Sequence, residues 1–103
     1  MEQFFELLNS GDRDGAVAMI DEKAEMRVHV GDNARTLRGL REIGGWFLRA
    51  ESGFRMMPGD VREMGSTYQA NLLIIRPGAT SQQLDASFRV EAGKITAINF
   101  TPR

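Results

Sequence analysis

The sequence predicts an α+β fold, in which N-terminal helices pack on one face of a curved and mainly antiparallel sheet. In much of the first half, apolar residues recur at intervals of three and four, the period of an amphipathic helix. From residue 54 onward they alternate with polar residues, the period of a half-buried strand. Helices followed by consecutive strands are typical of the α+β class. A chain of 103 residues suffices for one core, so we expect a single domain over 1–103.

Helices are expected over 2–9, 13–21 and 40–51. Each carries an apolar stripe on one side, and the first is too short to be stable unless it docks on the rest of the molecule. The third contains Gly44-Gly45, a pair that costs about 0.8–1 kcal/mol per residue relative to alanine. The pair indicates either a close approach to a strand or a ligand, or simply a loose helix.

Strands are expected over 26–30, 35–38, 54–64, 67–76, 82–91 and 94–101. Gly31-Asp32-Asn33 predicts a turn between the first two. Met57-Pro58-Gly59 indicates a bulge or bend in the third, because proline cannot donate a hydrogen bond to a neighbouring strand. Ala92-Gly93 predicts a tight turn between the last two.

Charge and hydropathy exclude two kinds of partner. Lys and Arg number 13 against 14 Asp and Glu, whereas a protein that binds duplex DNA needs a basic surplus on one face, so no nucleic-acid partner is expected. No apolar run approaches the roughly 20 residues of a membrane helix, so no membrane partner is expected either. Glu2 and Glu6 argue against a secretory signal at the N-terminus, and the expected location is the cytoplasm.

Residue types exclude several chemistries. The chain has no cysteine and a single histidine, and no acidic pair has ligand spacing on a shared face, so we expect no metal. The glycines form no phosphate-binding pattern, and no nucleophile elbow is present. We therefore expect no cofactor and no nucleophilic triad.

Three stretches resemble parts of a known superfamily: Leu8–Ala18, Leu37–Phe47 and Phe88–Ile95. Their order and spacing are similar to those of ketosteroid isomerases and SnoaL-like proteins, within the nuclear-transport-factor-2-like superfamily. The resemblance implies a cone-shaped fold, in which helices and a strongly bent sheet enclose an apolar pocket. It also implies a homodimer, which is common among these proteins.

The resemblance places apolar residues where the isomerases keep their catalytic groups. Phe4 stands in the place of the tyrosine that donates to the enolate, and Val28 in the place of the carboxylate base. Ala86 stands in the place of the protonated carboxylic acid. Enolisation needs a base and oxyanion donors, so ketosteroid isomerase activity is not expected.

A pocket for an apolar or weakly polar small molecule is the leading expectation. Its side chains would come from the first helix, the third helix and the inward faces of the strands. The expected ligand-binding residues are Phe4, Met26, Val28, Trp46, Met56, Tyr68, Ala86 and Phe88. The tryptophan and the methionines are also what a small domain uses to fill its core, and that alternative stays open.

No catalytic residue is assigned, and three polar side chains are the candidates. Tyr68 has inward parity and is expected to make a polar contact in the pocket or at its rim. Asp85 and His29 have outward parity, so alternation places both on the outer face of the sheet unless a bulge reverses it. Histidine is the residue type best suited to acid–base chemistry near neutral pH, which keeps His29 a candidate base.

Two further functions compete with ligand binding. One is an isomerase-, cyclase- or dehydratase-like enzyme that uses non-standard residues in the same cavity. The other is a non-enzymatic interaction module that uses the outer face of the sheet, and it requires an exposed apolar patch there. In addition, Arg35, Arg38 and Arg41 indicate either an anion site at the third helix or a solvated basic edge.

Overall fold

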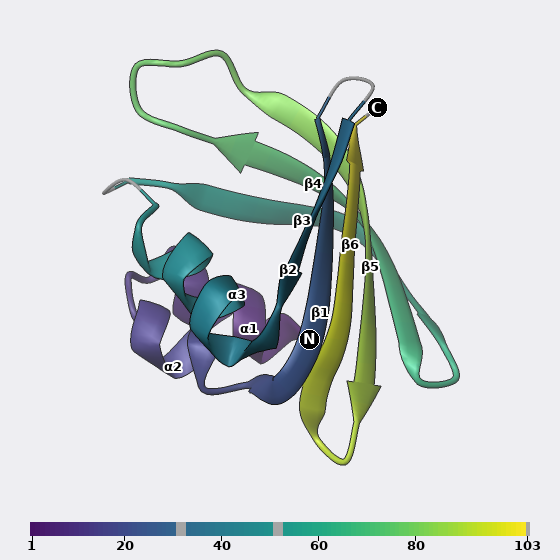
Figure 1. Cartoon of the computed structure of the whole chain (residues 1–103). Coiled ribbons are helices and arrows are strands. Elements are labelled where there is room, and N and C mark those ends of the chain that lie inside the picture. The colour runs from purple at the N-terminus through teal and green to yellow at the C-terminus, as the bar shows by residue number, and fades with distance from the viewer. Residues whose placement is uncertain (31–32, 51–52, 103) are drawn as a thin grey trace.

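The computed structural model describes residues 1–30, 33–50 and 53–102. Within these residues, the helices α1 (Glu2–Asn9), α2 (Arg13–Val17) and α3 (Gly39–Leu48) lie together on one side of a curved sheet (Figure 1). The strands are β1 (Ile20–Val30), β2 (Asn33–Arg38), β3 (Arg55–Met64), β4 (Thr67–Ile75), β5 (Gln82–Glu91) and β6 (Lys94–Pro102). None of the described helices is long and apolar enough to cross a membrane. The α+β class predicted from the sequence is confirmed.

The described strands form one sheet with the order β2-β1-β6-β5-β4-β3. Neighbours are antiparallel except for β1 and β6, which run parallel. The strand that comes last in the chain therefore lies in the middle of the sheet. In β3 the pairing with β4 shifts between Pro58 and Val61, which confirms the irregularity expected at the proline. Ala92 and Gly93 both have positive φ, as a tight hairpin turn requires.

The second helix is shorter than predicted, because β1 already begins at Ile20. Residues 21–25 are mostly charged helix formers, and their composition alone favours a longer helix. In the structure, pairing at both ends of this segment, of Ile20 with Ile95 and of Glu25 with Ala97, overrides that preference. A register shift between Ile20 and Glu25 interrupts the alternation, so the strand period is hard to read in the sequence there. Of the turn expected at Gly31-Asp32-Asn33, the first two residues lie outside the described residues.

The short helix α2 begins with a side-chain cap. The carboxylate of Asp12 accepts a hydrogen bond from the backbone N–H of Gly15, at 3.0 Å. A Cβ atom on Gly15 would lie only 2.6 Å from a carboxylate oxygen of Asp12. The glycine in the first turn therefore leaves room for the cap.

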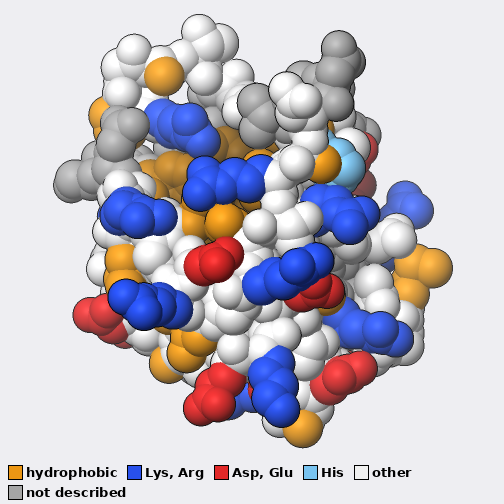
Figure 2. All heavy atoms as spheres, viewed as in Figure 1, with side chains coloured by type: hydrophobic (Ala, Val, Ile, Leu, Met, Phe, Trp, Pro, Cys, Tyr) orange, Lys and Arg blue, Asp and Glu red, His pale blue; other side chains and the backbone are white. Residues whose placement is uncertain are grey.

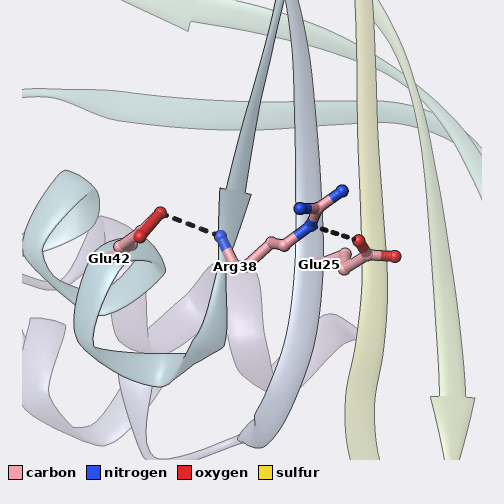
Figure 3. A network of polar contacts seen from close by, with 3 residues as sticks. All are labelled: Glu25, Arg38 and Glu42. Carbon is pink, nitrogen blue, oxygen red and sulfur yellow. Dashed lines mark hydrogen bonds and ion pairs between the residues drawn. The ribbon is translucent and has the colours of Figure 1, made fainter.

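The helix α3 is capped by a small polar network (Figure 3). The Glu42 carboxylate accepts a hydrogen bond from the backbone N–H of Arg38, and the Arg38 Nε donates to Glu25 on β1 at 2.9 Å. The side chains of Arg38 and Glu25 are 76% and 60% exposed, so their ion pair adds little stability. Of the three arginines that indicated an anion site, Arg38 thus already has an acidic partner.

Phenylalanine rings fill the core between α1, α3 and the sheet. Phe4 contacts Phe5, Phe47 and Phe88, with ring centroids 5.7, 5.7 and 6.1 Å apart. All four side chains are at most 3% exposed. Two of these three contacts are edge-to-face, and together the rings form the packed centre of the core.

Candidate functional site

A cavity of about 270 Å³ lies beyond this packed centre, between α3 and the ends of the strands. In the view of Figure 2, apolar surface is visible at the bottom of a recess in the upper half of the molecule, with basic side chains around it. The wall is mainly apolar and includes three aromatic rings. Its residues are Val28, His29, Trp46, Phe54, Met56, Ile74, Arg76, Gln82, Leu84, Phe100 and Pro102.

Strand register explains why these residues share one wall. Val28 on β1 pairs with Phe100 on β6, and Leu84 on β5 pairs with Pro102 on the same strand. Ile74 on β4 lies between Gln82 on one side and Met56 on the other. Directly paired residues point to the same face of a sheet, and here that face is the one covered by helices.

A second hollow of about 270 Å³ shares part of its wall with the cavity and is more open to solvent, and we call it the mouth. It is lined by Arg35, Trp46, Arg49, Ala50, Phe54 and Arg76. Trp46, Phe54 and Arg76 border both spaces, so the apolar wall is continuous from the cavity to the mouth. The ring centroid of Trp46 lies 6.4 Å from that of Phe54 and 6.0 Å from that of Phe100, the two other aromatic residues named above.

The structure brings three of the expected ligand-binding residues together at the cavity: Val28, Trp46 and Met56. Four others are buried in the packed core and do not line it: Phe4, Met26, Ala86 and Phe88. Alternation had placed Met26, Ala86 and Phe88 on the inward face of the sheet, and they lie buried there, while Phe4 faces the same core from α1. The phenylalanine cluster occupies that level of the cone.

The three polar candidates lie in different places. Tyr68 is half-buried against the core opposite Phe88, away from the cavity. Asp85 is exposed on the outer face, between Asn71 on β4 and Thr101 on β6. His29 is half-buried and borders the cavity near the end of β1, where the pairing of β1 with β2 and β6 has no register shift that would reverse the alternation.

The sequence analysis did not name several residues that line the cavity, although alternation along their strands indicates most of them. Ile74 and Arg76 have the same parity as the inward residues of their strand, and Gln82, Leu84 and Phe100 share the inward parity of theirs. Extending the alternation to the strand ends would have found them. Phe54 lies just before β3 and carries no comparable signal.

The site is cationic at its mouth. No acidic side chain is among the residues that line the cavity or the mouth, as far as the chain is described. Arg35, Arg49 and Arg76 are exposed, and none of them has an ion pair or hydrogen bond to another described side chain. By contrast, Arg38 is paired with Glu25. The arrangement is suited to holding an apolar body next to a negative charge.

Comparison with known proteins gives structural likenesses only. Neither a family model nor a curated protein matches the sequence. A solved NTF2-like protein of unknown function from Cytophaga hutchinsonii is similar with a TM-score of 0.82 and 16% identity, over 97% of this chain and 83% of that chain. An LEH-like epoxide hydrolase of M. tuberculosis is similar with a TM-score of 0.79 and 17% identity, over 99% and 78%.

A candidate ketosteroid isomerase from Kribbella flavida is also similar, with a TM-score of 0.77 and 11% identity, over 99% of this chain and 74% of that chain. Sequence identities this low support a shared fold but not a shared activity. The helices packed on one face of a bent, open sheet agree with these structures throughout the described residues. The chain accordingly has the nuclear-transport-factor-2-like fold, as its resemblance to SnoaL-like and ketosteroid isomerase-like proteins predicted.

Proposed function

We propose that this protein binds a small, largely apolar molecule in the cavity beside α3. The observation that carries the proposal is a hollow of about 270 Å³ whose wall holds Trp46, Phe54 and Phe100 and which shares part of that wall with a second, more open hollow. Ligand sites are typically concave spaces of about 300–1,000 Å³ with apolar walls and few polar groups. The cavity and its mouth together reach this range.

Burial of the ligand's apolar surface would drive binding, at roughly 25 cal/mol per Å². Besides Arg76, the polar residues of the wall are Gln82 and His29, and they would orient the ligand by hydrogen bonding. Neither Phe4 nor Ala86 could help, because both are buried in the core.

A screen of neutral and charged apolar fragments tests the proposal. Trp46 is the only tryptophan and borders both hollows, so its fluorescence reports directly on ligand binding. A fragment present at 100 times its Kd should also stabilise the fold by about 2.7 kcal/mol, which a thermal melt detects. We expect hits in both measurements.

A filled-cavity variant provides the control. Val28→Phe places a ring into the cavity, and should abolish the fluorescence response while the protein stays folded. Val61→Phe makes the same change at a position that is 41% exposed on β3 and outside the cavity, and should leave binding intact. A screen without hits, or hits that survive Val28→Phe, would contradict the proposal.

An enzyme at the same cavity is the second candidate, because His29 lies in the wall and could act as a base. One structural neighbour is an LEH-like epoxide hydrolase, so a panel of small epoxides is a reasonable first set of substrates. Turnover that is lost in His29→Gln, while fragment binding is retained, would support catalysis. The absence of turnover across the panel would argue for binding alone.

A further inference from the structure

We propose that the ligand is an amphipathic monoanion, with an apolar body in the cavity and a carboxylate held by Arg35, Arg49 and Arg76 at the mouth. This inference rests on the proposed function, since it requires a ligand in the cavity. It adds the chemical class of that ligand and the residues that select it.

Three different elements bring the arginines to one place. Arg35 lies on β2 directly opposite Val28, a residue of the cavity wall. Arg49 follows the end of α3, three residues after Trp46, and therefore lies on the same side of the helix. Arg76 follows the last residue of β4 and borders both the cavity and the mouth. The convergence is a property of the fold and cannot be seen as a charged run in the sequence.

Within residues 1–30, 33–50 and 53–102, the positive charge around the mouth has no acidic side chain beside it in the lining. Among the described residues that line the two hollows, none is Asp or Glu. The ion pairs between Arg38 and Glu25 and between Arg89 and Glu91 lie elsewhere in the described chain. The guanidinium groups at the mouth therefore keep their donors available. A guanidinium binds a carboxylate through two parallel hydrogen bonds, which makes arginine well suited to this head group.

The apolar wall explains why the anion should carry an apolar body. A bare anion such as inorganic phosphate would use the mouth and leave the aromatic cavity empty. Trp46 and Phe54 border both spaces, so one molecule can touch the aromatic wall with its tail and the arginines with its head. A neutral apolar molecule would fill the cavity but leave the positive charge unpaired.

Decanoate and 1-decanol make a matched pair of probes, because they share a ten-carbon chain and differ in the head group. We expect decanoate to bind about five- to tenfold more tightly in Trp46 fluorescence titrations at low salt, the gain typical of a few exposed ion pairs. Raising the ionic strength should weaken the binding of decanoate and leave that of decanol unchanged.

Reversing the charge of one arginine tests whether the mouth selects the anionic probe. Arg76→Glu should bring the ratio of the decanoate affinity to the decanol affinity to about one or below. Arg62→Glu makes the same change in net charge at an exposed position on β3 outside both hollows, and should keep the preference for decanoate. Urea unfolding of both variants establishes that they are folded.

The outcomes separate the two proposals. Equal affinity for both probes in the wild-type protein would overturn the anionic ligand and leave the binding function standing. A decanoate preference that is unchanged in Arg76→Glu would overturn the assignment to the mouth. If neither probe binds the folded protein, the binding function and the anionic ligand both fail.

Discussion

Two adjacent glycines in α3 face different surroundings. A Cβ atom on Gly44 would lie 3.1 Å from the Val17 side chain, which is tighter than an ordinary contact. A Cβ on Gly45 would meet only the guanidinium of Arg49, at 3.7 Å, which is an ordinary van der Waals distance. Gly44 thus allows α3 to approach α2 closely, whereas nothing in the packing requires glycine at the next position.

Alanine substitutions should separate the two glycines. Gly45→Ala should raise the free energy of unfolding by about 0.5–1 kcal/mol, because alanine favours the helix and the methyl group fits. Gly44→Ala should gain nothing or lose stability, because the methyl group pushes on Val17. Urea denaturation measures both. Equal changes in the free energy of unfolding would show that helix propensity alone sets the effect of each substitution, and that the close contact of Gly44 with Val17 contributes nothing.

At the scale of single residues, the sequence predicted which face of the sheet a side chain occupies better than it predicted whether that side chain reaches the cavity. Met26, Val28 and Ala86 were all placed on the inward face, but only Val28 reaches the cavity. The level at which the cavity opens depends on where the phenylalanine rings of the helices meet the sheet. That is a property of tertiary packing, and alternation along a strand carries no information about it.

Among the elements, α1 and β3 are joined by one side chain. The amide of Asn9 donates to the carbonyl of Met56 and accepts from its N–H, both at 2.8 Å. In the described sheet, β3 is an edge strand, and Asn9 supplies its free edge with the two hydrogen bonds that a neighbouring strand would make. The contact fixes the helix against the strand that carries Met56 into the cavity wall.

Removal of this contact should be costly. Asn9→Ala should lower the free energy of unfolding by about 1–3 kcal/mol, since it removes two hydrogen bonds and leaves backbone groups of Met56 unpaired. Ser10→Ala is the matched control, because its hydroxyl makes one exposed hydrogen bond within the same helix end, and should cost less than about 0.5 kcal/mol. A comparable loss in the two variants, by urea denaturation, would contradict this role of Asn9.

The boundaries of the elements show where sequence reasoning works. β5 was predicted over its full extent, because its alternation is regular and it is bounded by turns. The start of β1 was missed because the charged residues after Ile20 favour a helix and the register shift hides the strand period. Local preference is a weak guide where pairing with a distant strand decides the structure.

For the molecule as a whole, the outer face of the sheet carries exposed apolar side chains that we expect to lie in a dimer interface. Met57 and Leu73 are cross-strand partners on the face opposite the cavity, and they are 46% and 36% exposed. We expect a homodimer in sedimentation experiments, and expect Leu73→Glu to shift it to monomer. Leu48→Glu, at a 47% exposed position on α3, should leave the dimer intact. A wild-type monomer at micromolar concentration would contradict this prediction.

The central position of β6 has a consequence for synthesis in the cell. Before residues 94–102 leave the ribosome, the β1–β2 pair and the β3–β4–β5 meander are separate pieces, each with an open edge where β6 later inserts. Neither piece can complete its hydrogen bonding without that strand, and unpaired edges favour aggregation. The complete sheet can therefore form only after residues 94–102 have been synthesised and are free to pair, and the yield of folded protein should depend on how well chaperones shield those two edges until then.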